Sequence, residues 1–239
     1  MNTIKFEKRN ALAVAHRGLS GIERENTNAA FVAAGNRSYY GIETDIHRTA
    51  DGRFVVCHDS TLKRVGGEDV NVEAVSYDVL KNIVLLDKDG TKDREDLRPC
   101  TLENYISICK KYEKHCVLEL KSDFTEEETA RFIDIIRSYD YLDGVTFISF
   151  HYDNLVKIRN ILPEQSVQFL FSKFSDEILE RVIKDKMDVD IAHAELTEEL
   201  IARFHKAGIV VNCWTVDNKE RAEELAAWGV DYITTNILE

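Results

Sequence analysis

The chain has 239 residues, of which 44% are hydrophobic and 31% are charged, and its formal net charge at pH 7 is −12. This composition is typical of a folded globular protein and excludes a disordered or fibrous chain. The acidic balance argues against nucleic acid as a partner, whereas a small anionic substrate stays compatible because a local cation outweighs a distant net charge.

The cysteines and apolar runs bear on the location of the protein. Five cysteines without a CxxC pair predict neither a zinc site nor a disulfide framework. Cys57, Cys116 and Cys213 lie in apolar runs, where a thiol behaves as a small buried hydrophobic group. The first ten residues lack the apolar segment of a signal peptide, and no apolar run approaches the roughly 18 residues that span a bilayer. We therefore expect a cytoplasmic location without stable membrane insertion.

Short β-type runs alternate with amphipathic helical stretches along the chain. The predicted strands are Leu12–Ala15, Gly41–Ile46, Cys116–Leu120, Val145–Ser149, Val167–Leu170, Val189–Ala192, Ile209–Cys213 and Tyr232–Thr234. The predicted helices are Thr27–Ala34, Leu102–Tyr112, Glu126–Tyr139, Tyr152–Leu162, Asp176–Lys186, Glu198–Ala207 and Lys219–Ala227. Strands joined by helical crossovers in this number predict an α/β fold, a (β/α)8 TIM barrel, as a single domain over residues 1–239. An open doubly wound sheet fits less well, because residues 16–21 lack the full GxGxxG pattern.

Local signals mark several helix ends. Thr125 with Glu128 three residues later resembles a capping box, and Ala207-Gly208 and Trp228-Gly229 resemble helix stops. Few residues follow the last predicted strand. The closing helix of the barrel is therefore expected to be missing, or its place taken by N-terminal residues.

A long segment after the second strand breaks the alternation. Residues 53–98 contain a possible short strand, Arg53–Cys57, a possible short helix, Val75–Leu85, and the highly charged loop Asp87–Arg98. An insertion of this length is typically a lid or a substrate-selecting element. A solvated surface excursion is the alternative, and it suits Asp87–Arg98 better than residues 57–64.

Two predicted strands end in pairs of ionisable residues spaced two apart, Glu43 with Asp45 and Glu119 with Lys121. Alternate residues of a strand share one face, where uncompensated charge is costly. In a barrel the C-terminal strand ends form one functional rim. Three carboxylates meeting there must raise their pKa values or share a cation, and a hard divalent ion, Mg²⁺ or Ca²⁺, is the simplest candidate. A salt-bridge network with Arg17 and Lys121 is the alternative.

Two histidines follow apolar runs, His16 in LAVAH and His58 in FVVCH. A single histidine in such a place is usually a packed core residue. Two beside a carboxylate cluster fit general acid–base chemistry, because imidazole titrates near neutral pH. Asp59 can hold His58 only if a turn brings their side chains together.

Other polar residues of the predicted rim receive no role, namely Ser149, His151, Gln168, His193 and Asn236. His47, His115 and His205 are predicted to lie on the surface.

Three further residues suit a phosphorylated ligand. Arg17 offers a planar guanidinium for bidentate phosphate recognition, and Lys121 offers a point charge for a developing oxyanion. Trp214 ends the seventh predicted strand, where it can wall an apolar pocket around a small polyol. Core packing is the alternative role for Trp214.

At these residues the chain resembles the glycerophosphodiester phosphodiesterase family. The matching stretches run along essentially the whole chain: AHRG (15–18), ENTNAAF (25–31), GIETDIHRTADGRFVVCHDSTLKR (41–64), CTLENY (100–105), LELK (118–121) and NCWTVD (212–217). The resemblance implies a (β/α)8 barrel that hydrolyses glycerophosphodiesters to sn-glycerol 3-phosphate and an alcohol with a divalent cation. In the family, the substrate's own glycerol hydroxyl attacks phosphorus, and water then opens the resulting cyclic phosphate.

The resemblance also implies roles for single residues. It makes His16 and His58 the general acid and base, and Glu43, Asp45 and Glu119 the metal ligands. Arg17 and Lys121 would contact phosphate, and Trp214 would line the pocket. The chain departs from the family in having Arg24 where a proline usually precedes Glu-Asn-Thr, and in its short, charged insertion.

Two other functions remain open. Lysophospholipase D-type cleavage on the same barrel would need an apolar trough for an acyl chain, which the polar insertion disfavours. A non-catalytic barrel that binds a phosphorylated ligand would be expected to have lost a histidine or a carboxylate, and none is lost. A lysine-based aldolase or isomerase would leave the carboxylates and histidines without a joint purpose. The preferred alcohol, the cation and the oligomeric state are not determined by the sequence.

Overall fold

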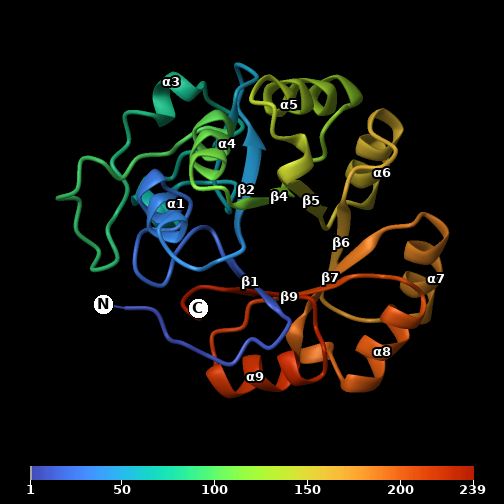
Figure 1. Cartoon of the computed structure of the whole chain (residues 1–239). Helices are drawn as coiled ribbons and strands as arrows, with labels where there is room; N and C mark the ends of the chain where they lie inside the picture. Colours follow the sequence, from blue (N-terminus) through green and yellow to red (C-terminus); the bar gives the residue numbers. More distant parts are fainter. Residues whose placement is uncertain (1) are drawn as a thin grey trace.

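Eight parallel strands form a closed ring in the computed structural model, which describes residues 2–239 (Figure 1). The strands are β1 (Leu12–Ala15), β2 (Gly41–Arg48), β4 (His115–Leu120), β5 (Val145–Ser149), β6 (Val167–Phe171), β7 (Asp188–Ala192), β8 (Val211–Trp214) and β9 (Tyr232–Thr235). Each strand pairs with the next in this order, and β9 pairs with β1 to close the ring. A further short strand, β3 (Phe54–Val56), pairs antiparallel with the end of β2 outside the ring.

Helices surround the ring on its outer side (Figure 1). They are α1 (Asn28–Gly35), α4 (Leu102–Lys111), α5 (Glu126–Ser138), α6 (Tyr152–Ile161), α7 (Asp176–Lys184), α8 (Glu198–Lys206) and α9 (Lys219–Ala227), with short 3-10 turns η1 (Leu142–Gly144) and η2 (His193–Glu195). The predicted (β/α)8 barrel is confirmed, and the predicted helices agree with these bounds within a few residues. None of the helices within residues 2–239 is long and apolar enough to cross a membrane.

The alternation of each strand divides its side chains between two apolar regions. Residues such as Ile42, Leu118 and Phe147 point outward into the layer between the ring and the helices. Their neighbours point inward, where Val14, Val117, Ile148 and Leu170 form a separate small cluster. The inward cluster forms an apolar layer inside the barrel.

The helix ends follow the signals in the sequence. Thr125 and Glu128 form the predicted capping box of α5, each side chain bonding to the other's backbone N–H. Gly208 and Gly229 adopt the left-handed conformation after α8 and α9, with φ of 76° and 87°. Both local predictions are confirmed.

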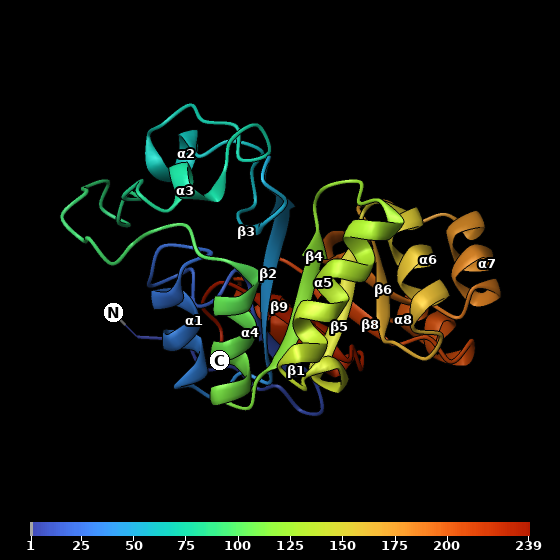
Figure 2. The ribbon, with the colours of Figure 1, turned by 90° about the horizontal axis from the view of Figure 1, so that it is seen from above.

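The insertion lies beyond the C-terminal end of β2 (Figure 2). It contains β3 and two short helices, α2 (Lys63–Gly66) and α3 (Tyr77–Leu80), around its own apolar cluster of Val55, Cys57, Leu62, Val65, Val72, Leu80, Leu85 and Leu97. The predicted helix over residues 75–85 is wrong in length, and α2 was missed. The backbone N–H of Leu85 donates to Leu97 and that of Leu86 donates to Val65, so the chain turns to pair with neighbouring segments after one helical turn.

Aromatic side chains attach the insertion to the barrel wall. Phe54 of β3 packs against Phe124 and Phe132, with ring centroids 6.0 and 5.7 Å away. All three rings are fully buried. Fixing β3 in this way also fixes the start of the segment that carries His58.

The two ends of the described chain lie side by side. Ile4 donates to the carbonyl of Ile237, and Glu239 donates to the carbonyl of Ile4. Phe6 joins the main core, and no helix follows β9 within residues 2–239. The N-terminal residues thus cover the outer side of the ring beside β9, as expected.

Candidate active site

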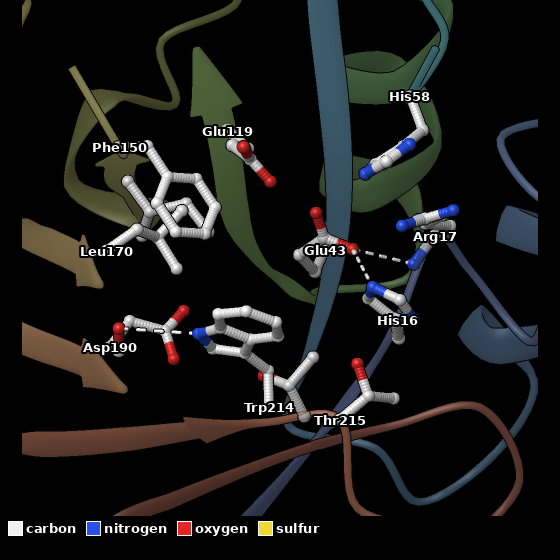
Figure 3. Close-up of a pocket in the computed structure, with 12 residues that line it drawn as sticks. His16, Arg17, Glu43, His58, Glu119, Phe150, Leu170, Asp190, Trp214 and Thr215 are labelled. Atoms are coloured by element: carbon white, nitrogen blue, oxygen red, sulfur yellow. Dashed lines mark hydrogen bonds and ion pairs between the residues drawn. The ribbon is translucent and has the colours of Figure 1, made fainter. Parts of the chain in front are cut away.

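A cavity of about 100 Å³ opens at the C-terminal ends of the barrel strands. It is lined by His16, Arg17, Glu43, His58, Glu119, Ile148, Phe150, Leu170, Asp190, Trp214, Thr215 and Thr234. The polar residues of β1, β2, β4 and the insertion form one side of it, and residues of β5 to β8 form the other (Figure 3). The rim expected from the sequence is therefore a cavity with two different walls.

Three carboxylates meet on the first wall. Asp45 and Glu119 are register partners on β2 and β4, and Glu43 lies two residues before Asp45. One oxygen from each of the three lies within 4.8 Å of the others, and all three residues are buried. The closed parallel pairing of β2 and β4 creates this cluster from residues that are more than seventy positions apart in the sequence.

The charges of this cluster are only partly balanced by the protein. Burial and the neighbouring Asp45 charge raise the pKa of Glu43 well above its usual value, and they raise the pKa of Glu119 to about 8. Burial opposes ionisation of Asp45 as well, but the charges of Arg17, His58 and Lys121 together with the hydrogen bond from Asn26 outweigh it, and the pKa of Asp45 is lowered. Asp45 Oδ1 is buried without a hydrogen-bond partner among residues 2–239. A cation between the three groups would fill this deficit.

Arg17 and Lys121 do form ion pairs with the cluster. Lys121 Nζ lies 2.8 Å from Glu119 Oε1 and 3.8 Å from Asp45 Oδ1, and Arg17 Nε lies 3.5 Å from Asp45 Oδ2. The salt-bridge network considered from the sequence is thus present. Within the described residues, this network leaves Asp45 Oδ1 without a hydrogen bond, so the salt-bridge and cation interpretations are compatible.

His16 is held by an amide. Its Nδ1 lies 2.8 Å from Asn236 Oδ1. The amide of Asn236 is oriented by Asp217, whose Oδ2 accepts from Nδ2 at 2.6 Å. Because Nδ1 must donate to the amide oxygen, Nε2 carries the lone pair, and it lies 4.0 Å from Glu43 Oε2. Burial and the Arg17 charge lower the pKa of His16 to about 4, so its imidazole is neutral at pH 7.

His58 is held by a carboxylate instead. Its Nδ1 lies 2.7 Å from Asp59 Oδ1, and Arg64 Nε donates to Asp59 Oδ2 at 2.7 Å. The turn that this contact requires is formed. Burial and the charges of Arg17 and Lys121 lower the pKa of His58 below its usual value, and the Asp45 charge and the hydrogen bond to Asp59 offset this only in part. His58 is also about one third exposed, so it faces the mouth of the cavity.

The loop after β1 positions Arg17 and braces Asp45. Arg17 itself has a φ of 54°, and its backbone N–H donates to Glu43 Oε2 at 2.7 Å. Asn26 donates to Asp45 Oδ2 at 2.8 Å. Glu25 accepts from Arg17 at 2.7 Å and from Arg64 at 2.6 Å, which ties this loop to the insertion.

The sequence-predicted site residues come together around one centre. His16, Arg17, Glu43, His58, Glu119 and Trp214 line the cavity, while Asp45 and Lys121 lie immediately behind this lining through their contacts with Arg17 and Glu119. The remaining rim residues behave differently. Ser149 and Gln168 are buried in hydrogen bonds to Leu120 and Asn212, and His151 and His193 do not line the cavity.

Two histidines that were predicted to lie on the surface are buried or partly buried. His47 is buried, because β2 continues beyond the ring and is covered by the insertion, where His47 bonds to Glu73 at 2.8 Å. His115 lies at the opposite end of the barrel from the cavity, partly buried against Tyr40 and 2.8 Å from Thr146 Oγ1. His205 is exposed, as predicted.

Sequence reasoning missed part of the lining. Asp190 is the one acidic residue of the predicted strand Val189–Ala192, which is a visible signal to which no role was attached. Asp217 was noted only inside a matching stretch, and its hydrogen bond to Asn236 depends on the fold. Ile148, Phe150 and Leu170 have no local signal that separates them from other core residues.

Fold and site together define a (β/α)8 barrel with a candidate metal centre and two histidines at the C-terminal ends of its strands. Residues 16–239 match the model of the Glycerophosphoryl diester phosphodiesterase family, and the chain belongs to that family.

The relatives cover nearly the same length. A glycerophosphodiester phosphodiesterase from Caldanaerobacter subterraneus subsp. tengcongensis is 29% identical over 231 residues, which are 94% of this chain and 93% of that protein. A lysophospholipase D from Rattus norvegicus is 44% identical over 64 residues only, 27% of this chain and 20% of that protein.

Solved structures of other proteins have the same fold over nearly the whole chain. The structure of an Oleispira antarctica phosphodiesterase in complex with the product sn-glycerol-3-phosphate superposes with a TM-score of 0.87 at 25% identity, over 94% of this chain and 92% of that chain. A glycerophosphodiester phosphodiesterase from Thermotoga maritima gives a TM-score of 0.75 at 25% identity, over 95% and 94% of the two chains.

Proposed function

We propose that this protein hydrolyses glycerophosphodiesters to sn-glycerol 3-phosphate and an alcohol with a bound divalent cation and two histidines. The observation that carries the proposal is the buried carboxylate cluster between two histidines whose Nδ1 atoms are already engaged. Residues 1–239 would act as one catalytic domain, with residues 53–98 contributing His58 and the rim.

The donor set fits a hard divalent cation, Mg²⁺ or Ca²⁺. Glu43, Asp45 and Glu119 provide oxygen ligands within reach of one another, and within residues 2–239 Asp45 Oδ1 has no hydrogen-bond partner and only a 3.8 Å ion pair with Lys121. When bound, the cation would supply positive charge that offsets the charge developing on phosphate oxygens. Arg17, which lines the cavity, and Lys121 behind it would add fixed positive charge for the phosphate.

The two histidines have different surroundings, which favours a division of labour. His16 is neutral, only partly exposed and bonded to an uncharged amide, so its Nε2 suits a general base. His58 is bonded to a carboxylate that favours its protonated form, and it faces the mouth through which an alcohol would leave. These features suit a general acid.

The proposed reaction has two proton-balanced steps. His16 accepts the proton of the glycerol 2-hydroxyl, whose oxygen bonds to phosphorus, while the bond from phosphorus to the alcohol oxygen breaks and that oxygen takes a proton from His58. In the second step, the oxygen of a water molecule bonds to phosphorus while the neutral His58 accepts a proton from that water. The bond from phosphorus to the glycerol 2-oxygen breaks, and that oxygen takes the proton held by His16. Both histidines return to their starting states, and sn-glycerol 3-phosphate is released.

The test is release of sn-glycerol 3-phosphate from glycerophosphocholine with Mg²⁺, Ca²⁺ and Mn²⁺ supplied separately. His16→Ala is expected to lower kcat about 10²- to 10⁴-fold with cation binding retained. His205→Ala, the same change at an exposed position, is the matched control and is expected to leave kcat unchanged.

Three outcomes would contradict the proposal. Absence of turnover on every glycerophosphodiester with all three cations would refute it. Preferred turnover of lysophospholipids would favour the lysophospholipase D alternative. Binding of sn-glycerol 3-phosphate without turnover of any diester would favour a non-catalytic barrel.

A further inference from the structure

The cavity wall opposite the histidines contains one unexplained acidic group. The lining residues contributed by β5 to β8 and the positions just after them are Ile148, Phe150, Leu170, Asp190, Trp214 and Thr215. Within the described residues 2–239, Asp190 is the one ionisable side chain of this wall. Figure 3 shows its carboxyl group beside the Trp214 indole, across the cavity from His16 and Arg17.

No contact within the described residues explains why a carboxyl group is buried at Asp190. Only 1% of the residue is exposed, and its Oδ1 is buried without a hydrogen-bond partner among residues 2–239. Trp214 Nε1 bonds to the backbone carbonyl of Asp190, at 3.4 Å, and not to its side chain. Asp190 is also not part of the three-carboxylate group. A buried polar atom without a partner is costly, so its presence calls for a ligand that completes it.

The surroundings restrict what that ligand is. Leu170 and Ile148 belong to the apolar inward cluster, and Trp214 packs against it, so the wall gives Asp190 no countercharge. Burial and the Glu119 charge raise the pKa of Asp190 well above its usual value, which favours a neutral carboxyl that can donate as well as accept. A hydroxyl group on a small aliphatic ligand matches both properties. The whole cavity, including the wall of His16 and Arg17, measures only about 100 Å³, so the part of the ligand beside Asp190 is small.

We propose that Asp190 is a specificity-determining residue that hydrogen-bonds the terminal hydroxyl of the substrate's glycerol moiety. The inference rests on the proposed function, in which the phosphate and the 2-hydroxyl lie against Arg17 and His16 on the opposite wall. The glycerol end then points towards Leu170 and Asp190. Loss of that hydroxyl would leave the buried carboxyl unpaired, which is how a polar pocket rejects an analogue.

The experiment compares two diesters in the cation-loaded enzyme. Glycerophosphocholine has both glycerol hydroxyls, and its analogue built on 1,2-propanediol keeps the attacking 2-hydroxyl but lacks the terminal one. The wild-type protein is expected to prefer glycerophosphocholine by roughly 10- to 100-fold in kcat/KM. Asp190→Leu is expected to lose most of this preference by slowing the glycerol substrate alone. Asp190→Asn, which still donates and accepts, is expected to keep most of it.

Two results would overturn the inference. Equal losses on both substrates in Asp190→Leu would mean a structural role, and an unchanged preference would mean that Asp190 does not contact the hydroxyl. Unfolding is not expected, since replacing an unpaired buried acid by an apolar group is often stabilising. If Asp190→Leu nevertheless fails to fold, Asp190→Ala takes its place with the same readout.

A binding measurement separates this inference from the proposed function. Titration calorimetry would compare sn-glycerol 3-phosphate with 1,2-propanediol phosphate on the wild-type protein and on Asp190→Leu. If the wild type turns over no diester but discriminates between these ligands through Asp190, the proposed reaction fails and the hydroxyl contact stands. If it turns over diesters without discriminating, the reaction stands and the contact is refuted.

Discussion

Replacing Asp59 by asparagine tests how His58 is held. The Asp59 carboxylate accepts two hydrogen bonds, one from His58 Nδ1 and one from Arg64 Nε, each at 2.7 Å. Asparagine offers only one oxygen, so one of the two donors must face the amide NH₂ group. If Arg64 keeps the oxygen, His58 is left without its acceptor or is driven to the other tautomer.

The magnitude follows from the bond that is lost. A hydrogen bond to a charged group contributes about 1.5–3 kcal/mol, which corresponds to roughly 10- to 150-fold in kcat/KM if it supports the reactive state of His58. Since the hydrogen bond to Asp59 raises the pKa of His58, its loss lowers that pKa further. The alkaline limb of the kcat/KM profile is therefore expected to move to lower pH, because less of the protonated acid is present.

The assay follows sn-glycerol 3-phosphate release by Asp59→Asn across pH 5–9, with thermal unfolding and cation titration run in parallel. Asp69→Asn is the matched control, because Asp69 belongs to the same insertion but is exposed and 3.5 Å from Lys63. The control is expected to stay within about twofold of wild type. If Asp59→Asn also stays within about twofold and its alkaline limb does not move, the proposed orientation of His58 is wrong.

Three further changes probe the cation site, pH-dependent stability and the loop after β1. Glu119→Gln is expected to weaken cation binding at least about 100-fold, since even groups that only orient a ligand are worth roughly 10- to 100-fold. Without cation it is expected to be about as stable as wild type, because the pKa of about 8 favours the neutral form of Glu119 at pH 7 and the glutamine oxygen still accepts from Lys121. Burial lowers the pKa of His115 to about 4 from 6.5, so the folding free energy that this group contributes above pH 6.5 is lost as the pH falls towards 4. In His115→Gln, the free energy of unfolding is therefore expected to fall by up to about 3 kcal/mol less over this pH range than in the wild type. Gly18→Ala is expected to destabilise the fold by at least about 2 kcal/mol, because φ is 74° and the new Cβ would lie 2.7 Å from Ala30.

Each of these expectations has a simple measurement and a result that contradicts it. Calorimetry with Mg²⁺ and Ca²⁺ would show unchanged affinity in Glu119→Gln if that carboxylate is not a ligand. Urea unfolding in EDTA at pH 7.5 and pH 5 would show parallel losses in wild type and His115→Gln if His115 does not titrate on unfolding. Gly90 also has a positive φ, 88°, with nothing within 4 Å of a new Cβ, so Gly90→Ala should be clearly milder than Gly18→Ala.

Much of the framework was predictable from local patterns. Short apolar runs alternating with amphipathic segments identified the ring strands and the outer helices within a few residues. Capping at Thr125 depends only on residues close in sequence, and it was identified correctly. The insertion was less predictable, since Leu85 bonds to Leu97 where a continued helix would have bonded to Lys81. Its short elements are set by its own small apolar cluster.

The sequence by itself determined which strand ends carry ionisable groups, because period-two spacing places Glu43 with Asp45 and Glu119 with Lys121 on one face. Only the tertiary structure decided what those groups contact. The pairing of β2 with β4 aligns Asp45 with Glu119, and the insertion covers His47. Ring closure brings Asn236 to His16 across 220 positions. The ring also places Asp190 in the opposite wall of the same cavity. Contacts between distant strands depend on register and curvature, which no local spacing encodes.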